Sequence, residues 1–301
     1  GGSELYTYHL SKELVRRGHD VVVLAGLQDL AIERYTVLET SLDGLRVVKI
    51  VNSNHYACNF RDFFIDETVD RLFRDVVRRE RPDVVHFQHV AYLSGNLPQV
   101  ASELGVPSLF TLHDYWYMCF RSHLIRPGLG PCPGPNGGAY CASCHDPVVL
   151  SPSAAPRSRW LLRAVRSRAI AKLNPRRWLS PAVVRRLKVA LYRRPPTEVP
   201  TEVAADEETV REHVYRMEFF KRELGFPRFV LSPSEHLKRR YEEAGFPEIA
   251  HVPLGFYPAA KVPRPRFDGT LKIAYLGNVA PFKGAHVILR EVLRLGNPGR
   301  V

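Results

Sequence analysis

The strongest constraint in this sequence is a repeated alternation between short apolar runs and longer amphipathic stretches. The apolar runs are rich in β-branched or aromatic residues and are bounded by turn signals, so each predicts a buried strand. These runs are Val21–Ala25, Leu45–Val51, Asp83–Phe87, Pro107–Leu112, Phe229–Leu231 and Ile249–Val252. Because strands that are apolar along their whole length are covered on both faces, the pattern predicts a doubly wound, Rossmann-like α/β domain with a parallel sheet.

The stretches between these runs predict helices, because their apolar residues recur at helical spacing. We expect helices over Ser3–Arg17, Val69–Val77, Leu97–Leu104, residues 206–224 and His236–Ala244. A helix that opens directly on glycines normally follows a strand, so we also expect a strand ahead of Gly1.

A proline-rich polar connector divides the predicted fold into two parts. We place an amino-terminal Rossmann-like domain at residues 1–257, a linker at 258–268 and the start of a second Rossmann-like domain at 269–301. In the second domain, Leu271–Leu276 predicts a strand and Gly284–Leu295 predicts a helix. Together they would form the first βα unit of a domain that continues beyond Val301.

The net charge of +12 is concentrated in one segment of the 301 residues. Residues 147–197 contain no Asp or Glu, and their arginines are interleaved with Trp160, Leu161 and Val165. This composition predicts a basic helical insertion at 151–197 that lies on an anionic membrane surface. A solvated basic surface and a nucleic-acid contact are the alternatives. No apolar stretch of about 18 residues is present, so no transmembrane helix is predicted.

Four of the five cysteines lie close together in the sequence. They are Cys119, Cys132, Cys141 and Cys144, in the spacing C-x12-C-x8-C-x2-C. The glycines and prolines between them predict a loop over 119–146 in which residues 126–131 and 133–138 form neither helix nor strand, and such a loop needs an internal tie. One structural Zn²⁺ held by four thiolates would supply that tie, and the closing C-x2-C is typical of zinc knuckles.

Other states of these thiols remain open. His123 or His145 could replace one of the zinc ligands. Free or redox-active thiols, two disulfides and an iron–sulfur cluster are the alternatives to zinc. Cys58 stands apart from the cluster, and we expect it to be buried and inert.

Two positions are candidates for ligand chemistry. Gly1 and Gly2 open a predicted helix, where backbone N–H groups are unpaired and a phosphate can approach closely, although a simple turn would also explain the glycines. His113 and Asp114 follow a predicted strand, at the edge where open α/β sheets bind ligands. The alternative for His113 is a hydrogen bond to the backbone alone.

Six motifs occur in an order that is similar to a known family. They are Gly1-Gly2-Ser3-Glu4, Arg17-Gly18-His19-Asp20, Pro82-Asp83-Val84-Val85-His86, Thr111-Leu112-His113-Asp114, Ser232-Pro233-Ser234 and Gly277-Asn278-Val279-Ala280-Pro281-Phe282-Lys283-Gly284. This set resembles the amino-terminal domain and linker of a GT-B glycosyltransferase of family 4.

The resemblance implies two facing α/β domains with the active site between them. It implies transfer of a sugar from a nucleoside-diphosphate sugar, with retention at the anomeric carbon and without a catalytic metal. The acceptor would be a glycan or lipid-linked saccharide in envelope or exopolysaccharide synthesis. The enzyme would be cytoplasmic, peripheral on the inner face of the plasma membrane, and would have no nucleic-acid partner.

The resemblance also implies roles for particular residues. Gly1, Gly2 and Ser3 would face the donor phosphates, and His113 would be the active-site histidine, with Asp114 beside it. Lys283, between Gly277 and Gly284, would offset charge on the leaving diphosphate.

The sequence departs from the family pattern in two respects. Asn278 takes a position where the family often has an arginine, and the family's Glu-x7-Glu pair would lie beyond Val301. We therefore expect residues 1–301 to be inactive on their own.

A non-catalytic module is the competing hypothesis. In it, a structural zinc knuckle and the basic segment would bind nucleic acid or another anion. The basic segment has few aromatic residues and no recognised nucleic-acid motif, which favours the transferase.

Overall fold

The computed structural model describes residues 2–54, 57, 59–126, 130–144, 206–255, 269, 273–277 and 283–294. The chain divides into two compact units, Gly1–Leu254 and Gly255–Val301. The predicted basic insertion at 151–197 and the predicted linker at 258–268 lie outside the described residues, as does Cys58.

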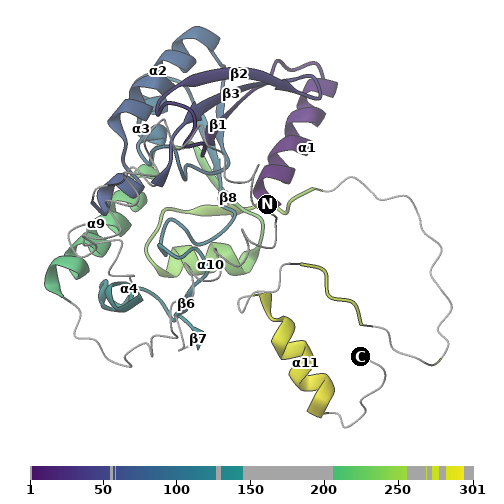
Figure 1. Cartoon of the computed structure of the whole chain (residues 1–301), viewed down its shortest axis with the longest axis vertical. Helices are drawn as coiled ribbons and strands as arrows, with labels where there is room; N and C mark the ends of the chain where they lie inside the picture. Colours follow the sequence, from purple (N-terminus) through teal and green to yellow (C-terminus); the bar gives the residue numbers. More distant parts are fainter. Residues whose placement is uncertain are drawn as a thin grey trace, which may run out of the picture. The chain divides into compact units, whose positions relative to one another are not determined.

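The first unit contains two main β-sheets, of three and four strands, with helices beside them (Figure 1). The first of these sheets has the order β1-β3-β2, with β1 (Val22–Leu27) parallel and β2 (Val37–Leu42) antiparallel to β3 (Leu45–Val51). The second sheet is wholly parallel and has the order β4 (Val85–Phe87), β5 (Ser108–Thr111), β8 (Phe229–Ser232), β9 (Ile249–His251). The predicted Rossmann-like α/β class is confirmed.

Strand β2 is an addition that the apolar pattern does not predict. Its last residue pairs with the first residue of β3, Leu42 with Leu45, so only Asp43 and Gly44 form the turn. Both turn residues have positive φ, 47° and 83°, which is the conformation that a tight hairpin requires. The side chains of β2 are largely exposed, so this strand lacks the apolar run that marks the others.

The five helices predicted in the first unit are present. They are α1 (Gly2–Arg16), α2 (Glu67–Glu80), α3 (Leu97–Glu103), α9 (Glu207–Glu223) and α10 (Glu235–Glu243). Capping side chains fix several of their starts: Asp66 accepts hydrogen bonds from the backbone N–H groups of Thr68 and Val69, and Ser234 accepts one from Leu237. A short 3₁₀ turn, η2 (Arg61–Phe63), precedes α2.

The hydrophobic core joins the parallel sheet to α2, α3, α9 and α10. Its buried aromatic residues come from the sheet and from the helices. Phe110 lies in β5, and it shares one cluster with Phe73 of α2, Phe220 of α9 and Tyr241 of α10. Stacking between Phe87 and Phe110, whose ring centroids are 5.6 Å apart, continues the core across β4 and β5. The core therefore holds the carboxyl ends of these two strands in place.

Helix α1 buries much less of its surface than its sequence predicts. Only Ser11 is buried, and the side chains of Leu5 and Val15 are 57% and 41% exposed. The helix lies on the other side of the strands from α2 and α3 (Figure 1), and both Tyr8 and Lys12 bond to Asp43 of the β2–β3 turn.

The cysteine-bearing loop has more regular structure than its composition predicts. The sequence predicts no strand at residues 126–131, but Ile125–Arg126 (β6) and Gly130–Pro131 (β7) pair as an antiparallel hairpin. A proline is tolerated in β7 because each strand of a two-stranded hairpin is an edge strand, where a missing N–H need not break a ladder bond. Beyond the hairpin, Ala139–Cys144 forms the short helix α4.

The second unit contains one described helix, α11 (Ala285–Arg294), at the place predicted for 284–295. The strand predicted at Leu271–Leu276 is not formed over its described residues 273–276. A strand needs a neighbour to complete its hydrogen bonds, and the described part of this unit offers none. Among the described residues, no helix is both long and apolar enough to cross a membrane.

The tight packing around Gly95 gives a test of this core. A Cβ at this position would lie 2.5 Å from the Phe219 ring and 2.8 Å from the Phe64 carbonyl oxygen. We expect Gly95→Ala to lower the free energy of unfolding by about 1–3 kcal/mol, because the ring and backbone must move. Urea denaturation measures this change. Gly255→Ala is the control, since nothing lies within 4 Å of its Cβ, and equal losses in both variants would contradict the described packing.

Candidate active site

Parallel pairing of β4 with β5 creates the candidate site. Phe87 pairs with Phe110, so the residues that follow both strands emerge at the same edge of the sheet. This register brings Gln88 and His89, which follow β4, next to His113 and Asp114, which follow β5. Carboxyl ends of parallel strands are the usual place for ligands in open α/β sheets.

The imidazole of His113 is oriented by an amide from the neighbouring strand. His113 Nε2 lies 2.8 Å from Gln88 Oε1, and an amide oxygen can only accept a hydrogen bond. Nε2 therefore carries the proton, and Nδ1 is left as a hydrogen-bond acceptor. Tyr6 of α1 also packs against this imidazole, with 5.6 Å between the ring centroids.

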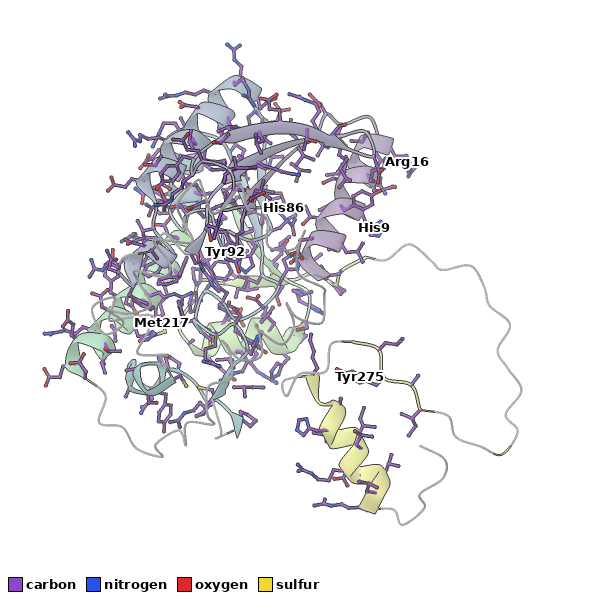
Figure 2. All side chains as sticks on the ribbon, viewed as in Figure 1. His9, Arg16, His86, Tyr92, Met217 and Tyr275 are labelled. Carbon is purple, nitrogen blue, oxygen red and sulfur yellow. The ribbon has the colours of Figure 1, made fainter. Side chains whose placement is uncertain are left out.

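The environment of His113 favours its neutral form. Burial, assisted by the nearby His89, lowers the pKa of His113 to about 4. Burial also lowers the pKa of His86, whose Nε2 lies 2.8 Å from Thr111 Oγ1 on the same sheet. His86 lies inside the first unit, whereas Arg16 of α1 points outward (Figure 2). At neutral pH, His113 can therefore accept a hydrogen bond but does not contribute positive charge.

Asp114 supplies the negative charge of this cluster. Burial alone would raise the pKa of Asp114, but the interaction with His89 and the bond from the Trp116 backbone N–H lower it overall. His89 Nε2 lies 3.6 Å from Asp114 Oδ2, while His89 Nδ1 accepts a hydrogen bond from the backbone N–H of Ala91. The result is a histidine–carboxylate pair beside a neutral histidine.

The other residues predicted for the donor site are distributed over both units. Gly2 begins α1, and a Cβ there would have no neighbour within 4 Å, which leaves space at the helix start. Ser3 is next to it and bonds to Glu4. Gly277, Lys283 and Gly284 belong to the second unit, and Gly284 directly precedes α11. Gly1 and Asn278 lie outside the described residues.

Sequence reasoning misses the partners of His113. Gln88, His89 and Tyr6 are not identified by it, although two polar residues directly after the apolar run Asp83–Phe87 are a usable signal. Parallel pairing with the following strand places those two residues beside His113.

The four clustered cysteines are free thiols that line one cavity. Burial, with the neighbouring thiols of Cys119, Cys132 and Cys144, raises the pKa of Cys141 to about 12. Among the described residues, no group of three or more His, Cys, Asp or Glu side chains is arranged to hold a metal ion as it stands.

The two histidines considered as substitute ligands do not join these thiols in the structure. His123 does not line the cavity and instead helps to lower the pKa of Asp114. His145 lies outside the described residues.

Comparison with known proteins identifies one relationship. The family model described as Glycosyltransferase Family 4 matches residues 1–170. The match includes α1, the strands β1–β5, the site at His113 and the cysteine-bearing loop. No curated protein matches the chain, and no solved structure does.

The lowered pKa of His113 predicts a measurable effect of pH on stability. Between pH 6.5 and about 4 the unfolded state binds this proton more readily than the folded state, so acid destabilises the fold. His113→Gln removes this penalty. We expect the stability of the variant relative to the parent to improve by roughly 1–2 kcal/mol from pH 7 to pH 4, a range that allows for solvent screening of a partly exposed imidazole.

The variant must be compared with the parent protein because other titratable groups change the stability in the opposite direction over the same pH range. Burial raises the pKa of Glu223 to about 7, so its contribution to stability declines as pH rises from 4.5 to 7. Urea denaturation at several pH values measures the difference between variant and parent. His236→Gln on the exposed face of α10 is the control, and an equal pH dependence for both variants would refute the buried, neutral state of His113.

Proposed function

The chain belongs to glycosyltransferase family 4, which makes it a glycosyltransferase, and we propose that its donor is a nucleoside-diphosphate sugar. The proposed acceptor is a glycan or lipid-linked saccharide of envelope or exopolysaccharide synthesis. Transfer retains the configuration at the anomeric carbon and uses no catalytic metal. The enzyme acts in the cytoplasm, on the inner face of the plasma membrane.

The observation that carries this proposal is the neutral, oriented imidazole of His113 at the carboxyl edge of the parallel sheet. Its Nδ1 has no hydrogen-bond partner among the described residues. A neutral imidazole accepts a hydrogen bond from a sugar hydroxyl without adding positive charge beside an anomeric carbon that is itself becoming positive. His113 therefore positions the transferred sugar, and Gln88 and Tyr6 hold the ring for that task.

The leaving group requires positive charge and N–H donors. As the anomeric carbon bonds to the acceptor oxygen, its bond to the diphosphate breaks, and the acceptor proton leaves with the diphosphate. Lys283 lies two residues before the start of α11, where unpaired backbone N–H groups favour an anion. The open start of α1 at Gly2 offers a second set of such donors. We assign the donor phosphates to these two helix starts.

A substitution at His113 tests the transfer reaction directly. We expect His113→Ala in the full-length protein to lower kcat by about 100-fold or more, because the sugar loses its oriented acceptor, while the fold is retained. Turnover of nucleoside-diphosphate sugars and circular dichroism measure the two properties. His236→Ala is the control, since this residue is exposed on α10. Near-normal turnover with His113→Ala would remove the residue from the mechanism.

The membrane contact rests on the sequence of the basic segment alone. Arginines at 157–194 without acidic neighbours favour anionic lipid headgroups, where each contributes about 1 kcal/mol of attraction. We expect the chain to co-sediment with vesicles containing phosphatidylserine and to be released by salt. Replacing Arg163, Arg166 and Arg168 by Gln should weaken this binding. Equal binding to neutral and anionic vesicles would exclude the electrostatic contact.

A further inference from the structure

The cysteine-bearing loop brings four thiols from separate segments to one small cavity. Cys119 follows the turn after β5, Cys132 follows β7, and Cys141 and Cys144 lie one turn apart on α4. All four side chains line that cavity. Spacing of i and i+3 places the last two on the same face of the helix. The fold therefore gathers thiols from three parts of the loop at one place.

Two arginine side chains near the thiols have no carboxylate partner among the described residues. Arg216 of α9 is 2% exposed, and it bonds to the backbone carbonyls of Trp116 and Tyr117. Its Nε has no hydrogen-bond partner, and neither has the buried Nε of Arg126 in β6. Within the part of the chain that the structure describes, neither arginine forms an ion pair with a carboxylate.

Both arginines bond to the segments that carry the thiols. Arg216 donates to the carbonyls of Trp116 and Tyr117, which precede Cys119 in the chain. Arg126 Nη2 donates to Ser143 Oγ, and Ser143 lies between Cys141 and Cys144 on α4. Each guanidinium is therefore held near the thiol cluster.

Neutral thiols leave this charge uncompensated. The Arg216 guanidinium lies over the rings of Trp116 and Phe220, 4.9 Å from each ring centroid. Aromatic faces offset only part of the free energy of burying a cation. Uncharged thiols offset almost none of it, so the site lacks negative charge.

We propose that Cys119, Cys132, Cys141 and Cys144 bind one structural Zn²⁺ as thiolates, with Arg126 and Arg216 as the neighbouring cations. A zinc ion with four thiolates carries a net charge of about −2, which two guanidinium groups balance. Binding releases the thiol protons and gives both arginines a counter-charge. This inference concerns the loop and stands independently of the transfer reaction.

Zinc binding requires movement of the thiols from the positions described. Because these side chains do not form a set that can hold a metal as they stand, the four Sγ atoms must move closer together within the cavity to coordinate zinc. Cys132 Sγ now donates a hydrogen bond to the Gly134 carbonyl, 3.3 Å away, which a thiolate would give up. The site is therefore assembled by the metal, as in small zinc-bound domains.

Metal content and ligand type test the proposal in the full-length protein. We expect elemental analysis to find about one zinc per chain, and Co²⁺ to replace it with the thiolate charge-transfer and tetrahedral d–d absorption bands. Cys132→Ser should abolish tight binding, whereas Cys58→Ser, which removes the cysteine outside the cluster, should retain it. A folded protein that binds neither ion would overturn the proposal, and so would bound iron with sulfide or disulfides detected by mass.

A second measurement remains decisive if Cys132→Ser does not fold. A strong chelator added to the parent protein should release zinc and expose the four thiols to titration at the same rate. Thiols that react fully before any metal is lost would contradict the assignment. Arg126→Gln should weaken zinc binding by about tenfold through the lost neighbouring charge. Arg239→Gln, whose side chain is 68% exposed on α10, should leave the affinity unchanged.

Discussion

The parallel pairing of β4 with β5 is the constraint on which the candidate site depends. One register, Phe87 with Phe110, decides that Gln88 meets His113 and that His89 meets Asp114. A shift by one residue would turn each of these side chains to the other face of the sheet. Because Phe87 and Phe110 stack in the core, the same contact that stabilises the fold also fixes the register of the site.

The turn after His113 is held from two sides. Tyr241 of α10 donates a hydrogen bond to the Asp114 carbonyl and accepts one from the Tyr117 backbone N–H. Arg216 of α9 donates to the carbonyls of Trp116 and Tyr117. Both helices come from sequence about a hundred residues or more further on, so this turn depends on contacts from the carboxyl-terminal part of the first unit.

Much of the fold could be predicted because local sequence and burial agree. Strand β3 and the start of α2 coincide with an apolar run and a capping aspartate, and the structure places both within a few residues of the prediction. Strand β2 was missed because its side chains are exposed and only its Asp43-Gly44 turn marked it. The strand expected at 271–276 had the right residues but no described neighbour to pair with.

The site was predicted less completely, for a different physical reason. His113 and Asp114 were identifiable because they follow an apolar strand, but Gln88 acts through a contact between strands that no local pattern records. Arg216 is a clearer case: helical periodicity identified the apolar face of α9, yet the partners of its buried cation are backbone carbonyls 99 and 100 residues away. Backbone groups have no sequence signature, so such contacts become visible only in three dimensions.

The buried cation links the thiol cluster to the candidate site. Arg216 contacts the carbonyls of Trp116 and Tyr117, and these two residues lie between Asp114 and Cys119 in the chain. A counter-charge from metal-bound thiolates would stabilise Arg216 in this position and, through it, the turn that follows His113. Neutral thiols would leave the same guanidinium buried without compensation. The proposed zinc would therefore stabilise the turn beside the candidate site as well as the cysteine-bearing loop.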